Sequence, residues 1–226
     1  MSVKIGVPSK GRLMDQCFDW FSTRGLFMRK AGAEREYSGL VEGMAGVELV
    51  LLSPGEIPRE LAAGRIDLGV TGMDLLRDTL PDWERQVEEV AALGFGHADL
   101  IIAVPMVWID VDTLDDLDAA AAAFRASHGH RLRIATKYHR LVRDYLTENG
   151  VADYQLVDSQ GATEGTVKNL TAEAIADITS SGATLRANHL KMLSEEPILK
   201  SQAMLYRARL SRGAEVAALL ARLGLR

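Results

Sequence analysis

The sequence predicts an α/β protein made of two lobes. Short apolar runs rich in β-branched residues alternate with stretches of helical periodicity along most of the 226 residues, as in sheets flanked by helices. A chain of this length holds one large domain or two small ones. Two segments, IDLGVTGMD and AIADITSSGATL, both end an apolar strand in small residues that lead into a helix. We therefore expect one mainly parallel sheet per lobe, covered by helices on both faces.

The first lobe is expected to begin with a strand at residues 3–7, which Pro8 ends because proline lacks the N–H needed for pairing. Apolar residues then recur at helical spacing from residue 13 to residue 26, which indicates a helix. Gly64 is expected to stop a later helix. The remaining elements are expected at residues 40–41 and 47–52 (a hairpin), 56–63 (helix), 66–70 (strand), 73–80 (helix), and 87–93 and 100–104 (strands).

The second lobe continues the alternation. Its elements are expected at residues 114–127 (an alanine-rich helix), 132–135 (strand), 137–149 (helix), 154–157 and 174–178 (strands), after TSSGAT (helix) and at 198–209 (a long strand). Thr136 is expected to cap its helix, and Gly150 to end it. We predict lobe I to comprise residues 1–99 and 190–226, and lobe II residues 100–189.

Composition and charge exclude several classes of protein. Acidic residues exceed basic ones by 31 − 26 = 5, so no overall positive field attracts nucleic acid or an anionic membrane. The longest nearly apolar run, residues 100–109, contains a proline and falls short of the roughly 20 residues of a membrane span. Charges interrupt the N-terminal apolar stretch, so no secretory signal is expected. A single cysteine, Cys17, cannot form an internal disulfide, and we expect a reducing, cytoplasmic location.

The strongest local signal for ligand binding is DITSSGATL, residues 177–185. Backbone N–H groups at a helix start bind anions, hydroxyls add donors, and Gly182 lets a ligand approach the backbone. Asp177 would repel phosphate, so its expected role is to accept hydrogen bonds from sugar hydroxyls or to hold Mg²⁺. An ordinary capped turn accounts for the same residues, and both readings stay open at this point.

A second candidate anion site is PSKGR, directly after the first strand. Lys10 and Arg12 flank Gly11 at a strand end, where ligands of open α/β sheets bind. Gly6 and Gly11 have the spacing of a P-loop, but Arg12 and Leu13 follow where that loop needs Lys and then Ser or Thr. We therefore expect a basic clamp rather than an NTPase loop, with a solvated basic turn as the alternative.

Other signals are weaker. GFGHAD, residues 94–99, lacks the third glycine of a dinucleotide fingerprint. His128 and His130 have no carboxylate at ligand spacing, so a solvated turn is expected there. Cys17 lies on the apolar stripe of its helix and is expected to be a buried thiol.

Together these stretches resemble the short form of ATP phosphoribosyltransferase, a family that opens histidine biosynthesis. The matching stretches are VPSKGRL, ELAAGRIDLGVTGMDLL, LGFGHADLIIAVP, RLRIATKYHRL, GATEG, AIADITSSGATLRANHL and ILKSQAML. They cover most of the chain from its first strand to its last. The resemblance implies two lobes like those of type II periplasmic binding proteins. It also implies that ATP and 5-phosphoribosyl pyrophosphate (PRPP) meet in an active-site cleft between the lobes.

The resemblance also implies roles for individual residues. The PRPP set comprises Glu164, Asp177, Thr179, Ser180, Ser181, Gly182, Ala183 and Thr184. The catalytic cations are Lys10, Arg12 and Arg35, and Ser9, Gly11, Gly72 and Asp74 line the ATP and pyrophosphate side. Mg²⁺ is implied as cofactor, with its ligands unassigned.

The sequence departs from the family pattern at four places. Val167, Leu170 and Glu173 stand where the pattern has Pro, Gly and Asp, and Ser53 with Pro54 stands where it has an arginine. The local fold around residues 166–173 and the number of cations at the site are the features these departures affect.

The implied reaction transfers the 5-phosphoribosyl group of PRPP to N1 of the adenine of ATP and releases pyrophosphate. The resemblance further implies a histidyl-tRNA-synthetase-like regulatory subunit, and a homodimer when the chain is alone. Residues 212–226 predict only one helix after the last strand, with an apolar stripe expected to pack on its own lobe. The rival functions are a solute- or effector-binding protein without chemistry and a PRPP-dependent transferase acting on another base.

Overall fold

The structure is a computed structural model that describes residues 2–30, 38–159, 161–193, 196–211 and 213–225. The chain folds into two compact units, the first of residues 1–97 and 202–226 and the second of residues 98–201. The sequence predicts the return to the first lobe at residue 190, which is too early. Two short strands after that point pair with a strand of the second unit, so the return falls after Ser201.

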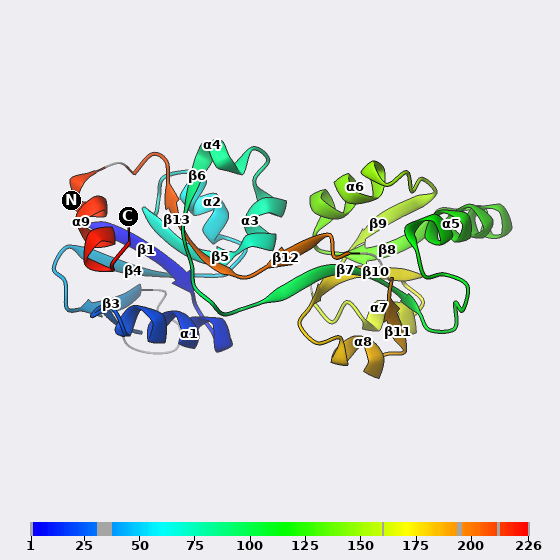
Figure 1. Ribbon diagram of the computed structural model, residues 1–226, viewed down its shortest axis with the longest axis horizontal. Coiled ribbons are helices and arrows are strands. Elements are labelled where there is room, and N and C mark those ends of the chain that lie inside the picture. The colour runs from blue at the N-terminus through cyan, green and yellow to red at the C-terminus, as the bar shows by residue number, and fades with distance from the viewer. Residues whose placement is uncertain (1, 31–37, 160, 194–195, 212, 226) are drawn as a thin grey trace. The chain divides into compact units, whose positions relative to one another are not determined.

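Within the described residues, the first unit holds a seven-stranded sheet in the order β2-β3-β4-β1-β5-β13-β6 (Figure 1). Its strands are β1 (Val3–Pro8), β2 (Phe27–Lys30), β3 (Ser38–Glu42), β4 (Val47–Leu52), β5 (Leu68–Gly72), β6 (Val87–Ala92) and β13 (Ala203–Ala208). Its helices are α1 (Gly11–Ser22), α2 (Ile57–Ala62), α3 (Met73–Thr79), α4 (Trp83–Gln86) and α9 (Ala214–Arg222). The elements β2 and α4 are the ones that the sequence reading missed.

The expectation of a mainly parallel sheet is wrong. In the first unit only the centre is parallel, where β1 pairs with β4 and β5. The outer strands β2, β3, β13 and β6 pair antiparallel. Pairing direction depends on how the chain connects distant strands, which local periodicity does not encode.

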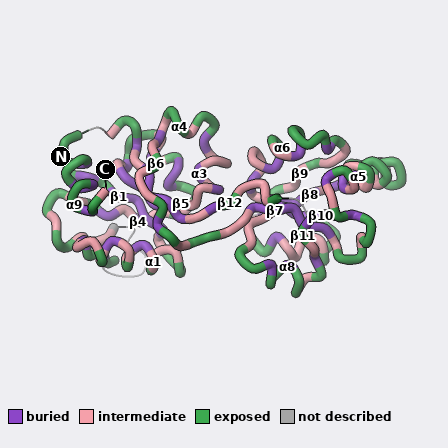
Figure 2. Tube along the Cα trace, in the orientation of Figure 1, coloured by how far each residue is buried: buried purple, intermediate pink, exposed green. Residues whose placement is uncertain are grey.

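Helices cover both faces of this sheet. One core cluster joins α1, through Phe21, and α9, through Leu219, to the strands, and a second joins α2 and α3 through Leu61 and Leu76. Figure 2 shows these buried stretches along β1 and β5. The final helix packs on its own unit, as expected. Cys17 is fully buried in the first cluster, and this burial raises the pKa of its thiol to about 12.

The second unit, within the described residues, has a sheet in the order β11-β7-β10-β8-β9, with β12 also pairing with β7. Its strands are β7 (Ala98–Pro105), β8 (Leu132–Thr136), β9 (Tyr154–Asp158), β10 (Ala174–Thr179), β11 (Leu190–Met192) and β12 (Leu199–Ser201). Its helices are α5 (Leu114–His128), α6 (His139–Glu148), α7 (Gly165–Lys168) and α8 (Ala183–Ala187). Here too only β10, β8 and β9 are parallel, while β11, β12 and β10 run antiparallel to β7.

The long strand expected at residues 198–209 is two strands, β12 and β13. They belong to different units because the chain leaves one sheet after Ser201 and enters the other at Ala203. No helix in the described part of the chain combines the length and the apolar character that a membrane span requires.

Candidate functional site

Three neighbouring strand ends in the first unit carry the candidate residues of the N-terminal part of the chain. β4, β1 and β5 are adjacent and parallel, with Pro8 in register with Leu52. Parallel strands end at the same edge of a sheet, so the loops that follow these three strands lie together. This edge brings together six of the predicted residues, Ser9, Lys10, Gly11, Arg12, Gly72 and Asp74.

The β1–α1 loop has the features of an anion site. Gly11 has a φ of +75°, a left-handed conformation that favours glycine. Lys10 is the N-cap residue of the twelve-residue helix α1, and its side chain makes no capping hydrogen bond. The first N–H groups of α1 therefore lack that partner, and the exposed cations Lys10 and Arg12 stand beside them.

The β5–α3 junction is more closed. The Thr71 hydroxyl donates to the Pro54 carbonyl at 2.9 Å, which ties the junction to the β4–α2 turn. Asp74 is only 6% exposed, in the first turn of α3, where the helix N-terminus stabilises a carboxylate. Gly72 is half-buried. Of these predicted residues, Asp74 is thus held inside the unit, whereas the Lys10–Arg12 turn reaches solvent.

The β4–α2 turn, where the family pattern has an arginine, closes on itself. The Ser53 N–H donates to Glu56 Oε2 at 2.9 Å, and the Glu56 N–H donates to the Ser53 carbonyl at 3.0 Å. The backbone N–H of Ser53, followed by its side chain, lowers the pKa of Glu56. The predicted cations that the structure describes at this edge are Lys10 and Arg12, because Arg35 lies outside the described residues.

The glycine-rich segment after β6 packs against this edge. β6 and β5 both run antiparallel to β13, so β6 ends at the same edge as β5. Gly96 has a φ of +67°, and a Cβ there would lie 3.3 Å from Leu13 of α1 and 3.3 Å from Ala203. The Ala203 N–H donates to the Phe95 carbonyl at 3.0 Å. This segment therefore packs against Leu13 in the first turn of α1. Its glycine pattern alone does not predict this contact.

A matching edge exists in the second unit. β10, β8 and β9 are adjacent and parallel, with Ala135 in register with Ile175 and Thr136 with Asp158. The β10–α8 loop, the β8–α6 junction and the β9–α7 connection therefore emerge together. This edge collects all eight residues of the predicted PRPP set.

In the β10–α8 loop, backbone N–H groups are hydrogen-bonded to hydroxyls of the same loop. Gly182 has a φ of +67°, and its N–H donates to Thr179 Oγ1 at 2.9 Å. The Ala183 N–H lies 3.4 Å from Ser181 Oγ. Ser180, Ser181, Ala183 and Thr184 are exposed. The loop thus presents hydroxyls and the two backbone N–H groups of Gly182 and Ala183, whose hydrogen-bond partners are hydroxyls of the loop itself.

Two cations at this edge were missed by the sequence reading. A Cβ on Gly182 would lie 3.1 Å from Arg186 Nη1, so the Arg186 guanidinium covers the loop. Its position one helical turn after Gly182 is the signal that could have found it. Lys137 is the first residue after β8, the strand that lies between β10, which carries Asp177, and β9, whose connection to α7 carries Glu164.

Lys137 is half-buried, and its Nζ lies 4.9 Å from the ring centre of the fully buried Tyr138. Among the described residues no carboxylate pairs with Lys137 within 4.0 Å. A cation held over an aromatic ring at a strand end, beside a hydroxyl-rich loop, is a candidate anion ligand.

The predicted cap of α6 is wrong. Thr136 Oγ1 accepts the Tyr138 N–H at 3.0 Å, and α6 begins at His139, with Tyr138 as its N-cap residue. The hydroxyl of Thr136 therefore shapes the junction that carries Lys137 rather than the helix itself. His139 Nε2 lies 3.3 Å from Asp158 Oδ1, across the neighbouring strand end.

One predicted carboxylate, Asp177, lies at the end of β10, and the other, Glu164, lies in the connection that follows β9, on the other side of β8. Asp177 is half-buried, and its Oδ1 accepts the Ile178 N–H at 2.8 Å. Glu164, also half-buried, is the N-cap residue of α7 but its side chain makes no capping bond. It follows the buried Thr163, whose hydroxyl accepts from Ser159 Oγ at 3.1 Å. Among the described residues, no three His, Cys, Asp or Glu side chains gather into a possible metal centre.

The fold and the two strand edges define a class: two-unit α/β proteins whose functional loops gather at the carboxyl ends of parallel strands. Solved structures support this class. A histidine kinase sensor domain with similarity to periplasmic binding proteins matches 98% of this chain and 86% of its own, with a TM-score of 0.54 and 14% identity. A chain of the ATP phosphoribosyl transferase (HisG:HisZ) complex from Thermotoga maritima matches 98% of this chain and 96% of its own, with a TM-score of 0.75 and 19% identity. At these identities the likeness shows the fold.

Sequence comparison gives the family within that class. The family model for HisG, ATP phosphoribosyltransferase, matches residues 53–224. The ATP phosphoribosyltransferase of Cereibacter sphaeroides is 74% identical over 226 residues, covering 100% of this chain and 96% of that protein. The chain belongs to the ATP phosphoribosyltransferase family, as its motifs predict, and matches the short form nearly end to end.

The family decides between the rival functions. ATP phosphoribosyltransferases are pentosyltransferases, and they transfer the 5-phosphoribosyl group of PRPP to N1 of the adenine of ATP in the first step of histidine biosynthesis. A binding protein without chemistry shares this fold but not this family. The chain is therefore an enzyme.

Proposed function

We propose that the chain transfers the phosphoribosyl group while the β10–α8 loop holds the 5′-phosphate of PRPP. The carrying observation is Gly182, whose left-handed backbone turns its N–H toward the hydroxyl-rich side of the loop. A phosphate oxygen is a stronger acceptor than the Thr179 or Ser181 hydroxyl. It would take over the Gly182 and Ala183 N–H groups, and the displaced hydroxyls would become donors to it. Ser180 and Thr184 add two exposed hydroxyls.

Lys137 and Arg186 supply positive charge to the same ligand. The Arg186 guanidinium already lies over Gly182, and Lys137 has no carboxylate partner within 4.0 Å among the described residues. Burying part of a phosphate at this edge requires such charge, because the net charge of the chain is −5. These two cations provide locally the positive charge that the chain as a whole lacks.

Glu164 and Asp177 are assigned to the ribose hydroxyls of PRPP. The Glu164 side chain makes no capping hydrogen bond, and Asp177 accepts the Ile178 N–H with Oδ1. Both carboxylates lie at the edge that carries the phosphate loop. Carboxylates accept hydrogen bonds from sugar hydroxyls and tolerate the positive charge that develops on the ribose as its C1 bond breaks.

The carboxyl edge of the first unit is assigned to ATP and to the pyrophosphate leaving group. Lys10 and Arg12, together with the N-terminus of α1 and the backbone at Ser9 and Gly11, provide the donors. Arg35 is assigned with them as a third cation. Gly72 and the buried Asp74 shape the neighbouring wall on the ATP side.

The chemistry demands charge and positioning rather than a strong base. Adenine N1 is unprotonated at neutral pH and is itself the nucleophile, so no Ser, Cys or His has to activate it. The bond from ribose C1 to pyrophosphate breaks with oxocarbenium character, and cations at the leaving group stabilise the charge that it gains. Positioning of two bound substrates can account for about 7 to 11 kcal/mol of the barrier.

The donor set fits Mg²⁺ that arrives with substrate. Mg²⁺ prefers oxygen ligands, keeps several waters, and is held in many enzymes by one or two carboxylates plus substrate phosphates. Asp177 and Glu164 can provide those carboxylates, and the described residues contain no larger acidic cluster. When bound, the ion would neutralise charge on the pyrophosphate.

The proposed partners are ATP, PRPP and a regulatory subunit. The Thermotoga maritima structure is a HisG:HisZ complex, which supports a second, histidyl-tRNA-synthetase-like chain as the histidine sensor here. Alone, the chain is proposed to form a homodimer. We place it in the cytoplasm, without nucleic-acid or membrane partners, because its net charge is negative and its one cysteine is a buried thiol.

Two assays test this proposal. Incubation of the protein with ATP, PRPP and Mg²⁺ should release pyrophosphate at a rate that falls when GTP replaces ATP or when Mg²⁺ is chelated. Low histidine should inhibit only after the synthetase-like subunit is added, through coupling between distinct sites. Equal rates with GTP would contradict the substrate assignment, and inhibition of the isolated chain by low histidine would contradict the regulatory one.

A further inference from the structure

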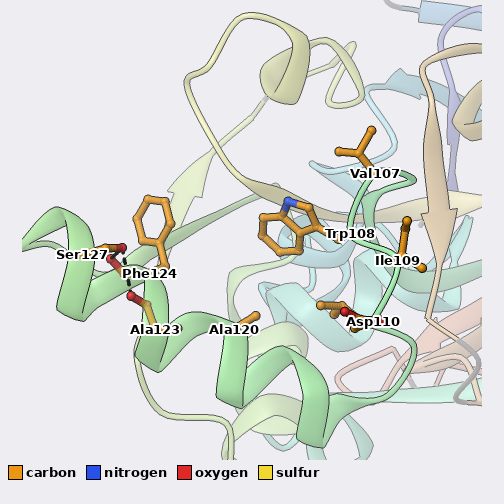
Figure 3. Close-up of a pocket in the computed structure, with 9 residues that line it drawn as sticks. Val107, Trp108, Ile109, Asp110, Ala120, Ala123, Phe124 and Ser127 are labelled. Carbon is orange, nitrogen blue, oxygen red and sulfur yellow. Dashed lines mark hydrogen bonds between the residues drawn. The ribbon is translucent and has the colours of Figure 1, made fainter.

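A cavity of about 480 Å³ in the second unit lies away from the candidate site. It opens between α5 and the connection that precedes this helix, with Trp108 and Phe124 among its walls (Figure 3). None of the residues that line it belongs to the candidate site. Nothing among the described residues shows what would cover its apolar walls, so the cavity assigns no ligand. The contacts that bear on the reaction lie in the first unit, beside the turn that carries Lys10 and Arg12.

The Lys10–Arg12 turn has few contacts of its own to hold it in place. Lys10, Gly11 and Arg12 are all exposed. The Lys10 side chain makes no capping hydrogen bond, and the first fully buried residue of α1 is Cys17. Gly11 has a φ of +75° with open space around it, and glycine leaves the backbone free to move. The position of the two cations therefore depends on the contacts at the two ends of the turn.

Ser9 and Leu13 provide these contacts. The Ser9 N–H donates to the carbonyl of Leu52, the last residue of β4, at 2.8 Å. Leu13, the residue after Arg12, is half-buried and packs against the core of the unit. Its Cδ1 lies 3.3 Å from the point that a Cβ on Gly96 would occupy, so the side chain packs on the bare backbone of Gly96. The turn is thus tied to β4 at one end and to the segment that contains Gly96 at the other.

Gly96 gives Leu13 a fixed surface to pack on. The Ala203 N–H donates to the Phe95 carbonyl at 3.0 Å, and the Leu93 N–H donates to the Ala203 carbonyl at 3.0 Å. These bonds hold the segment against β13, whose first residue, Ala203, is only 1% exposed. The Cβ of Ala203 also lies 3.3 Å from the point that a Cβ on Gly96 would occupy. Carbon atoms in ordinary contact are about 3.5–4.0 Å apart, so a methyl group there would push a neighbour away, and Leu13 is the neighbour that the sheet does not hold.

We propose that Leu13 and Gly96 are positioning residues for Lys10 and Arg12, because their contact fixes the turn where its two cations meet the pyrophosphate group. The proposal rests on the assignment of this edge to ATP and pyrophosphate in the proposed function. A displacement of about 1 Å at a catalytic group can lower the rate about 100-fold, so a shift of a few tenths of an ångström is measurable. The residues of the PRPP set belong to the second unit. A disturbed contact should therefore lower kcat and leave the affinity for PRPP unchanged.

A comparison of Gly96→Ala with Gly94→Ala tests the proposal. Gly94 and Gly96 have φ values of +76° and +67°, so alanine at either position carries similar backbone strain. A Cβ on Gly94 would meet no atom within 4 Å, which makes G94A the matched control. G96A should lower kcat for pyrophosphate release about 5- to 20-fold, with PRPP affinity by calorimetry within about 2-fold of wild type. G94A should match wild type in both quantities, and circular dichroism checks that both variants are folded.

Leu13→Ala reaches the same contact from the other side and keeps the proposal testable if G96A does not fold. It should lower kcat about 5- to 20-fold, whereas Leu13→Met, which keeps a long apolar side chain, should retain most of the wild-type kcat. Independent effects would multiply in the double variant L13A/G96A. The new methyl group at position 96 instead occupies space that the Leu13 side chain has vacated. The double variant should therefore be no slower than the slower of the two single variants.

The double variant K10A/R12A shows whether the contact acts through these two cations. In this background G96A should lower kcat by less than about 2-fold more, because no charge is left to position. A further loss of about 5-fold or more would overturn the proposal, since Gly96 would then act on another part of the site. Wild-type kcat in K10A/R12A would overturn the assignment of this edge together with the proposal. A slow K10A/R12A with wild-type kcat in both G96A and L13A would leave that assignment intact and overturn the proposal alone.

Discussion

Glu173 accepts three hydrogen bonds from one residue, Arg133. The Arg133 backbone N–H donates to Oε2 at 2.8 Å and its Nε donates to the same oxygen at 3.1 Å, while Nη2 donates to Oε1. The same Nη2 also donates to the Leu170 carbonyl at 3.0 Å. Two positions at which the chain departs from its family pattern therefore hold a single arginine of β8.

Replacing Glu173 by glutamine is expected to destabilise the folded protein by about 1–2 kcal/mol at neutral pH. Burial alone would raise the pKa of Glu173, but the side-chain and backbone hydrogen bonds from Arg133 and its charge lower it overall. The folded pKa thus lies below the unfolded value of about 4.3. The stabilisation is complete above that unfolded value and is lost as pH falls through the folded pKa. Thermal unfolding at pH 7 and pH 3 measures it, and an equal difference between the two proteins at both pH values would contradict it.

Leu170→Gly is expected to stabilise the protein by about 0.5–1 kcal/mol. Leu170 is 79% exposed and has a φ of +57°, a conformation that costs a residue with a side chain about 1–2 kcal/mol. Glycine removes this conformational cost. It also raises the conformational entropy of the unfolded chain, which offsets part of the gain in stability. The melting temperature should rise by about 1–4 °C. Leu210→Gly is the control, because Leu210 is similarly exposed without a positive φ and should lose stability.

Gly182→Val is expected to lower the affinity for PRPP at least 100-fold, whereas Ser180→Ala lowers it about 3- to 10-fold. Valine is strained at a φ of +67°, and its Cβ would meet Arg186 Nη1 at 3.1 Å. Calorimetric titration with PRPP gives both affinities. Gly150→Val matches the backbone strain, at a φ of +76° with open space around it, but lies outside the loop. If Gly182→Val and Gly150→Val bind PRPP equally well, the loop does not hold the phosphate.

Lys137→Ala is expected to raise KM for PRPP about 10- to 50-fold with a smaller change in kcat. The lost charge contacts a phosphate that is bound in both the ground state and the transition state, and such uniform binding appears in KM. Lys137→Arg should recover most of the affinity. Arg143→Ala, which removes an exposed cation from α6, is the control and should leave KM unchanged. Steady-state kinetics at saturating ATP separates these outcomes.

Alanine variants of Lys10 and Arg12 are expected to lose about 100-fold in kcat while PRPP affinity changes less than about 3-fold. Their charge matters most as pyrophosphate separates, so they stabilise the transition state more than the bound substrate. Stopped-flow pyrophosphate release and calorimetry give the two quantities. The control is Lys4→Ala, which removes an exposed cation from β1, the strand that precedes this turn, and should behave as wild type. An unchanged kcat in both alanine variants would remove this turn from the catalytic machinery.

The sequence predicts best what local chemistry decides. Pro8 ends β1 and the Gly182 loop precedes α8 because these are backbone constraints of a few residues. It misses β2, where Met28 is the only buried side chain, so no apolar run marks the strand. It also joins β12 to β13, because only residues 200–202 separate Leu199 from the apolar run that begins at Ala203, and the step between the two sheets leaves no other signal in the sequence.

The candidate site shows the same division. Lys10 and Gly182 are found because glycine and basic or hydroxyl residues follow strands directly. Lys137 and Arg186 are missed because their relevance depends on which strands are neighbours and on what lies one helical turn away. The departure at Leu170 is readable only in the structure, where a left-handed backbone explains why the family pattern has glycine there.

The insertion of β13 between β5 and β6 determines the order in which the chain can fold during synthesis. Every strand of the second unit lies within residues 98–201, so its sheet can close as soon as that stretch has been made. The first unit, although it is translated first, has to wait with both β5 and β6 lacking a neighbour until residues 203–208 arrive. A ribosome that stalls before that point therefore leaves a finished unit beside an unfinished one with two open sheet edges, which are recognition sites for chaperones and for aggregation.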